Sequence, residues 1–385
     1  MTDSAEGDGA TERETTVGKY RLEHSPSQIA AIVDRYQQLR AKREPLARAF
    51  LDGTRPYMIF HTPGNDLWSD TSDPEDCFVR NLDLVEQSLA VPSDHLPTLE
   101  PWFGTGLYAN MYGCDYVWRD GEAPCVHYRF HSLDEVRSLA KPRWEDSDIA
   151  HLVLDTIRYF KSKTGDAIPI VWTDTQSAHD TATLILDASE VFTACLTEPE
   201  TIMAFMRNIN ALIIEFSKVQ AELIGDALVM PGHIMLSNAG FTGMSISDDN
   251  LAVGSPAVNA ACNLPLDEEI GKAFGGVAIH SCGQWDRTMR LLARHVPSCV
   301  AIDCALETGG DPNPNPPEPV RDAIAGTGIH LHVRLTSDTP AMCEIIKRVA
   351  HPDIKLIVHP NFTDVPTAER NYEAIGSLLK RFYGV

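Results

Sequence analysis

Short hydrophobic runs alternate with longer amphipathic stretches along the chain, most regularly after residue 168. The short runs predict strands, because they are bounded by turn residues, and the stretches with hydrophobic residues at helical spacing predict helices. The predicted strands are 57–60, 168–172, 227–230, 277–280, 300–303, 330–335 and 355–358. The predicted helices are 25–52, 76–89, 201–224, 267–274, 285–295, 320–325, 341–350 and 367–382. Residues 232–250, rich in Gly, Ser and Asp, are expected to form a long loop.

Strands that alternate with helices form a parallel sheet whose two faces are both covered. The repetition and the length of 385 residues favour an α/β fold of the (β/α)8 TIM-barrel type over an open sheet. No Gly-x-Gly-x-x-Gly follows a predicted strand and no P-loop is present, so the nucleotide-binding folds lose their main support. We expect residues 1–24 to be a flexible leader and residues 25–385 to form a single barrel domain with an N-terminal helical segment.

The charge of the chain excludes several classes of partner. With 32 basic and 54 acidic side chains the formal net charge is −22, which argues against nucleic acid and against an anionic membrane surface. The sequence contains neither a hydrophobic stretch of about 18–20 residues nor a secretory signal. Its nine cysteines are scattered and odd in number, which is typical of reduced thiols, and we expect a cytoplasmic protein.

Three predicted strands end in residues that can carry chemistry, at the end of the barrel where active sites lie. His280 and Cys282 leave one strand on the same side, and an imidazole with a thiolate favours zinc. A zinc site usually has a third protein ligand, for which His359, Asn361 and Cys304 are the candidates. The alternative is a buried histidine and cysteine with no metal.

Two adjacent carboxylates, Asp248 and Asp249, lie in the predicted 232–250 loop. They could act as an acid and a base, bind substrate or orient a zinc ligand, and the alternative is a solvated turn before a helix. Other candidates for contacting a substrate are Glu100, Trp102, Phe103, Trp172, Asp174, His330 and His332. The aromatic residues and histidines among them are more often part of a core.

These segments together resemble the uroporphyrinogen decarboxylase superfamily, and more closely its branch of corrinoid-dependent (cobalamin) methyltransferases. The resemblance runs from about residue 43 to the C-terminus. It is carried by Pro101-Trp102-Phe103-Gly104, Ser247-Asp248-Asp249, Ile279-His280-Ser281-Cys282-Gly283 and Pro366-Thr367-Ala368-Glu369-Arg370-Asn371. The His-x-Cys-Gly motif in this order along the chain is the most specific of the four.

The resemblance implies a (β/α)8 barrel in which His280 and Cys282 bind zinc. The family's third ligand is normally a cysteine in a late strand-end loop, but residues 356–361 contain none, so His359, Asn361 or no ligand remains open there. The decarboxylases carry an N-terminal arginine-rich loop for the porphyrinogen carboxylates, whereas residues 53–57 offer only Arg55. Together with the charge of −22, this ranks porphyrin decarboxylation below methyl transfer.

The expected function is zinc-dependent transfer of a methyl group between a small methylated substrate and a corrinoid protein. A methoxy-aromatic substrate, and hence O-demethylation, is one option. The expected cofactors are Zn²⁺ and a corrinoid (cobalamin) on a partner protein, and a homodimer is a further option. The alternatives are a decarboxylase or other lyase that works without metal, and a non-catalytic binding protein on the same barrel.

Overall fold

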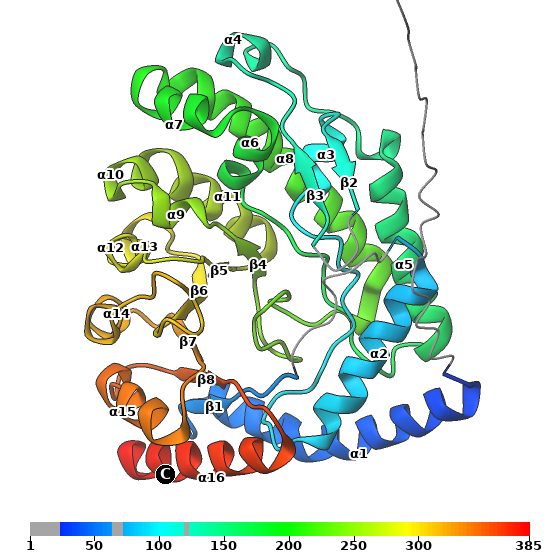
Figure 1. Cartoon of the computed structure of the whole chain (residues 1–385), viewed down its shortest axis with the longest axis vertical. Helices are drawn as coiled ribbons and strands as arrows, with labels where there is room; N and C mark the ends of the chain where they lie inside the picture. Colours follow the sequence, from blue (N-terminus) through cyan, green and yellow to red (C-terminus); the bar gives the residue numbers. More distant parts are fainter. Residues whose placement is uncertain (1–23, 64–71, 119–122) are drawn as a thin grey trace, which may run out of the picture.

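The computed structural model of the protein is a (β/α)8 TIM barrel, which confirms the predicted fold class. The structure describes residues 24–63, 72–118 and 123–385, so nearly all of the predicted leader lies outside the described residues. Six parallel strands pair in the order β1-β8-β7-β6-β5-β4, and helices surround them (Figure 1). The strands are β1 (Tyr57–Ile59), β4 (Met244–Ser247), β5 (Val277–His280), β6 (Cys299–Ala305), β7 (His330–Leu335) and β8 (Leu356–Pro360).

Short extended segments complete the wall between β1 and β4. The backbone pairings that close it join Ile59 to Asp94, Leu99 to Ile170, Ile170 to Leu228, and Pro231 to Ser245. The prediction of regular strands over 168–172 and 227–230 is therefore wrong, because these segments make only isolated bridges. Pro169 cannot donate a ladder hydrogen bond, and a 3-10 turn (Gly225–Ala227) together with Pro231 limits the second segment.

The prediction of one continuous loop over 232–250 is also wrong, because this segment contains β4. Met244-Ser245-Ile246-Ser247 alternates hydrophobic and polar residues, and its serines obscured the strand in a sequence rich in turn formers. Pairing of β4 with β5, from Met244–Val277 to Ser247–His280, stabilises a strand that local propensity does not favour.

Sixteen α-helices are described, and they cover most of the predicted helical regions. The longer ones are α1 (Pro26–Leu51), α2 (Pro74–Ala90), α5 (Asp148–Thr164), α6 (Ala178–Ile185), α7 (Ala188–Thr197), α8 (Pro199–Ile224), α11 (Leu264–Phe274), α14 (Pro317–Ile324), α15 (Thr339–Val349) and α16 (Val365–Tyr383). The short ones are α3 (Leu107–Met111), α4 (Leu133–Val136), α9 (Asn250–Val253), α10 (Pro256–Val258), α12 (Asp286–Met289) and α13 (Leu292–His295).

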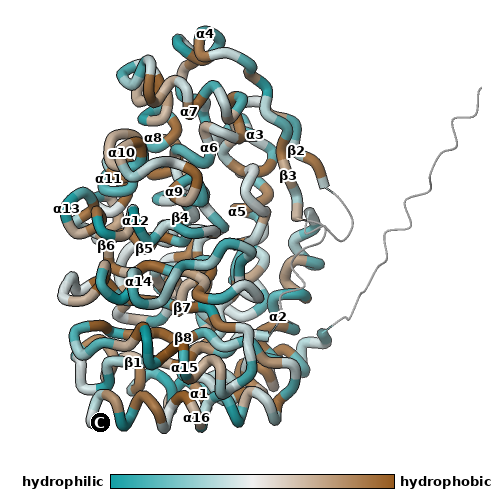
Figure 2. The backbone as a smooth tube through the Cα atoms, turned by 60° about the vertical axis from the view of Figure 1, so that its left-hand side comes forward, coloured by the Kyte–Doolittle hydropathy of each residue, from teal (hydrophilic) through white to brown (hydrophobic). Residues whose placement is uncertain are grey.

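Ser25, the first residue of the predicted helix 25–52, begins α1 through a capping box with Gln28. The predicted helix 285–295 is wrong as a single element, since it is divided into α12 and α13 without a proline or glycine at the break. A small antiparallel pair, β2 (Asp115–Val117) and β3 (Cys125–His127), was not predicted. Hydrophobic and hydrophilic residues alternate along α16 (Figure 2), and Ala368, Ile375 and Leu379 are among those that are buried. None of the helices in the described part of the chain combines the length and hydrophobicity needed to cross a bilayer.

The segment between Pro231 and β4 passes through the inside of the ring of strands (Figure 1). Met235 packs there against Ala278 and Ala301, on the inner faces of β5 and β6. Leu236 and Phe241 pack against hydrophobic residues of α1 and β1. This segment fills one layer of the interior with hydrophobic side chains, and polar side chains gather beyond it, where the strands end.

The start of β4 depends on a close approach between two glycines. Gly243 has φ +90°, and a Cβ there would lie 2.8 Å from the carbonyl carbon of Gly276. We therefore expect Gly243→Ala to lower the free energy of unfolding by about 2–4 kcal/mol. Gly326 has φ +76° with nothing within 4 Å of such a Cβ, so Gly326→Ala should cost about 1 kcal/mol. Urea denaturation measures the unfolding free energy of both variants. Equal losses would show that the close approach of Gly243 to Gly276 does not contribute to stability.

Candidate metal site at the carboxyl ends of the strands

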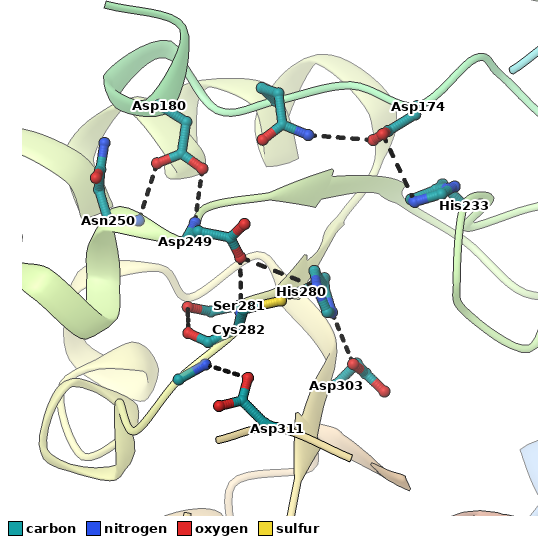
Figure 3. Close-up of polar contacts among 12 residues, drawn as sticks. Asp174, Asp180, His233, Asp249, Asn250, His280, Ser281, Cys282, Asp303 and Asp311 are labelled. Atoms are coloured by element: carbon teal, nitrogen blue, oxygen red, sulfur yellow. Dashed lines mark hydrogen bonds and ion pairs between the residues drawn. The ribbon is translucent and has the colours of Figure 1, made fainter. Parts of the chain in front are cut away.

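His280 ends β5, and Asp303 on β6 fixes the orientation of its ring (Figure 3). The His280 Nδ1 lies 2.7 Å from Asp303 Oδ2. Burial by itself would lower the pKa of His280, but the hydrogen bonds with Asp303 and Cys282 raise it to about 10. Burial would raise the pKa of Asp303, but Arg334 and His280 hold it well below its usual range. Asp303 is therefore a buried carboxylate that leaves His280 Nε2 directed into the mouth of the barrel.

The structure places Asp249, not His359, beside His280 and Cys282. One ligand atom from each of Asp249, His280 and Cys282 lies within 4.8 Å of the others. His280 Nε2 is 3.4 Å from Cys282 Sγ and 3.9 Å from Asp249 Oδ1. The same Asp249 oxygen accepts a hydrogen bond of 2.6 Å from the backbone N–H of Cys282 (Figure 3). His359 Nε2 instead lies 3.0 Å from the Thr62 hydroxyl.

This donor set fits zinc. Imidazole nitrogen, thiolate and carboxylate oxygen are its usual ligands, and three protein ligands are typical of catalytic sites that keep one position open. A carboxylate on the far nitrogen of the histidine, here Asp303, is the usual support of a metal-bound imidazole.

The turn after the motif is held by a second carboxylate. Gly283 has φ +77°, a conformation that glycine adopts without strain and that permits a tight turn here. Its backbone N–H donates to Asp311 Oδ2 at 2.7 Å, and Asn313 donates to the other oxygen of Asp311. These bonds fix the position of Cys282 relative to the end of β5.

The two predicted catalytic carboxylates face different surroundings. Asp249 contacts the motif, whereas Asp248 is fully buried and lies with Asp180 and Asp267 in a carboxylate cluster. Burial and mutual repulsion raise the pKa of all three, that of Asp267 to about 8. Asp180 accepts hydrogen bonds from the backbone N–H groups of Asp249 (2.6 Å) and Asn250 (2.9 Å), so the cluster supports the segment that carries Asp249 (Figure 3).

The raised pKa of Asp267 has a consequence for stability. The folded state binds this proton more tightly than the unfolded chain, so the contribution is complete below about pH 4 and is lost as the pH rises to about 8. We expect Asp267→Asn to reduce this loss, which for one proton is at most about 1.4 kcal/mol per pH unit. Denaturation from pH 4 to 8 tests this, with the exposed Asp322→Asn as control, and an unchanged slope would contradict the raised pKa.

Glu100 and Asp174, two predicted substrate contacts, meet at a histidine that the sequence did not single out. His233 Nδ1 lies 2.6 Å from Glu100 Oε1, and its Nε2 lies 3.7 Å from Asp174 Oδ2. Burial alone would lower the pKa of His233, but the two carboxylates raise it to about 9. The one feature of the sequence that could have indicated His233 is its position shortly after the predicted strand 227–230.

The predicted aromatic contacts lie in packed surroundings. The Trp172 indole N–H donates to the Ser217 carbonyl on α8, so this ring packs outward between the wall and the helices. Phe103 is fully buried and packs edge-on against Trp118. Trp102 is also buried.

Of the two predicted histidines on β7, His332 lies closer to the carboxyl end. It is fully buried, 5.6 Å between ring centroids from His359. His330 begins the strand and packs against Phe50 and Phe241 in the hydrophobic layer. The remaining candidates for the third zinc ligand lie elsewhere: Cys304 is buried among core residues, and Asn361 is exposed beyond β8.

Arg55, the single arginine in the segment that corresponds to the porphyrinogen-binding loop, is already occupied. Its Nη1 lies 2.8 Å from the buried Asp94, and its guanidinium stacks on Tyr57. It is therefore not free to bind a substrate carboxylate.

Comparisons with known proteins agree with this architecture. Residues 103–243 match the sequence model of the family described as uroporphyrinogen decarboxylase (URO-D). No curated protein matches the chain. A solved structure of a methyltransferase from Methanosarcina mazei is similar, with a TM-score of 0.55 over 81% of this chain and 86% of that one. At 16% identity this likeness establishes the fold alone. The family match confirms the resemblance to the uroporphyrinogen decarboxylase superfamily that the sequence predicted.

Proposed function

We propose that the protein is a methyltransferase that moves a methyl group between a small methylated substrate and the cobalt of a corrinoid on a separate protein. The observation that carries the proposal is the convergence of Asp249, His280 and Cys282 at the ends of β4 and β5. The shared fold of the Methanosarcina mazei methyltransferase supports the same class of reaction.

Zinc is the metal that we propose for this group, with His280, Cys282 and Asp249 as its ligands. Asp249 takes the place for which His359 was expected. Bound there, zinc would act as a Lewis acid on an oxygen or lower the pKa of a thiol. Exchange of the family's usual second cysteine for a carboxylate makes the donor set harder, which favours the action on oxygen and hence a methoxy substrate.

The residues around the ligands have separate tasks. Asp303 accepts the hydrogen bond from His280 Nδ1 and so keeps Nε2 available. His233, with its pKa raised to about 9, holds a proton at neutral pH and could deliver it to the oxygen from which the methyl group leaves. When the methyl group passes from a methoxy substrate to the corrinoid, the carbon–oxygen bond breaks and its electron pair stays on the oxygen. The two electrons of cob(I)alamin form the new carbon–cobalt bond. Transfer from methyl-corrinoid to a thiol is the variant in the reverse direction.

The test is a methyl-transfer assay with the zinc-loaded protein and cob(I)alamin. We expect methylcob(III)alamin to form from at least one member of a panel of methoxybenzenes, detected by absorbance, and Cys282→Ala to stop it. Cys343→Ala, which changes a partly exposed thiol on α15, is the matched control. Carbon dioxide release that resists chelation would instead show a lyase, and a protein with neither turnover nor zinc would be a binding protein.

A further inference from the structure

We propose that the substrate of this site carries an anionic oxygen group, such as a carboxylate, which Arg334 binds. The idea that this substrate is also the methyl donor or acceptor rests on the proposed function above. The anion site itself rests only on the surroundings of Arg334.

Arg334 lies near the carboxyl end of β7, beside His359 on β8 and Ala305 on β6 in the strand register. Its Nε lies 2.9 Å from Asp303 Oδ2, the oxygen that also binds His280. Its Nε and Nη2 are inaccessible to solvent, and neither makes a hydrogen bond to any described residue. Asp303 supplies a counter-charge on the Nε side, so the inaccessible Nη2 is the nitrogen for which a ligand can supply an acceptor.

The neighbouring side chains add ring nitrogens that have no hydrogen-bond partner. Both ring nitrogens of His332 and the Nδ1 of His359 make no hydrogen bond within the described part of the chain. Burial lowers the pKa of His332 to about 4 and that of His359 to about 3, so each ring is neutral and keeps one N–H. His332 therefore offers a ligand one donor and one acceptor, beside a guanidinium group that can only donate.

The acceptors nearby do not fill this need. Asp303 Oδ1 lies 3.8 Å from His332 Nδ1, which is too long for a direct hydrogen bond. The oxygens of Asp311 accept the backbone N–H groups of Gly283 and Asn313. A planar carboxylate presents two acceptor oxygens and matches the guanidinium fork, which makes it the best-fitting ligand group.

The location links this anion site to the metal candidates. The guanidinium of Arg334 shares Asp303 with His280 and lies close enough to Cys282 for a charge interaction. A small molecule whose anionic group binds Arg334 would extend its remaining atoms toward His280 and Cys282. Two-point binding of this kind would select methylated acids over neutral methoxy compounds.

The test compares ligands of equal shape and different charge. Benzoate with benzamide, and acetate with acetamide, are titrated calorimetrically into the purified protein, as isolated and after chelation. We expect at least one carboxylate to bind tighter than its amide, and Arg334→Gln to weaken that carboxylate by about 10- to 100-fold without changing amide binding. Arg348→Gln, which removes an exposed arginine paired with Glu318, should bind as the wild type does.

Three results would overturn the anion site. The first is that neither carboxylate binds tighter than its amide, and the second is that Arg334→Gln keeps the preference for the carboxylate. The third is a preference that disappears on chelation and is unaffected by Arg334→Gln, because zinc would then hold the carboxylate. Should Arg334→Gln not fold, Arg334→Lys replaces it. That variant keeps the charge without the fork, and we expect an intermediate loss of carboxylate affinity.

Turnover separates the two proposals. If carboxylates bind through Arg334 but no methoxy compound methylates cob(I)alamin, the anion site stands and methyl transfer fails. If methoxybenzene reacts as fast as 3-methoxybenzoate, and Arg334→Gln leaves that ratio unchanged, methyl transfer stands and the anion site fails.

Discussion

A protein with His280 replaced by alanine should bind no zinc and should transfer methyl groups at least about 10³-fold more slowly than the wild type. His280 supplies the one nitrogen ligand of the group, and its Nε2 lies 3.4 Å from Cys282 Sγ and 3.9 Å from Asp249 Oδ1. Zinc stoichiometry by mass spectrometry and the cob(I)alamin assay measure the two effects on the same preparation.

The control for this variant is His351→Ala. His351 lies after α15, is partly exposed, and accepts a hydrogen bond from the Asp353 N–H, so its loss should change neither readout. Equal zinc content in the wild type and His280→Ala would exclude His280 as a ligand. Zinc loss in both histidine variants would point to a general effect on the fold.

Replacing Asp303 by asparagine should be the most destabilising change at the site, at about 3–5 kcal/mol of unfolding free energy. The carboxylate is completely buried and lies 2.7 Å from His280 Nδ1 and 2.9 Å from Arg334 Nε. The amide keeps the shape but leaves the guanidinium without a counter-charge. Urea denaturation measures the loss, and Asp322→Asn, at an exposed ion pair with Arg321, should change stability by less than about 1 kcal/mol.

The pH dependence provides an independent check on Asp303. Its pKa is held below the ordinary value in the folded protein, so its contribution is complete above about pH 4 and is lost as the pH falls further. Asp303→Asn should therefore lower stability at pH 7 more than at pH 3. It should also weaken zinc binding by about 10- to 100-fold, because the His280 ring would no longer be held by the Asp303 carboxylate. If Asp303→Asn were as stable as the wild type at pH 7, the ion pair of Asp303 would not contribute to stability.

Together the two variants separate ligation from support. His280→Ala should remove zinc from the folded protein, whereas Asp303→Asn should weaken both the metal site and the fold. A variant that loses methyl transfer but keeps zinc and stability would identify a group that acts on the substrate.

By itself the sequence determined the barrel and the motif. The alternation of hydrophobic runs with amphipathic stretches is local, and local spacing decides whether a segment can bury one face as a strand or a helix. The proximity of His280 and Cys282 was likewise predictable, because residues i and i+2 at a strand end start on the same side. Asp174 follows the predicted strand 168–172 and so was expected at the same end of the barrel, whereas no predicted strand precedes Glu100.

Only the tertiary structure decided the third member of the group. Asp249 reaches Cys282 because β4 pairs with β5, and β4 was hidden in a segment whose serines and glycines predicted a loop. His359 was the expected third ligand by sequence, but its strand lies three places from β5 in the sheet, where its ring meets Thr62. Arg334 gave no local signal either, since its Nε and Nη2 become inaccessible to solvent only when β7 pairs with β6 and β8. Periodicity fixes which face of a strand a residue occupies, whereas the order and register of the strands fix which side chains meet.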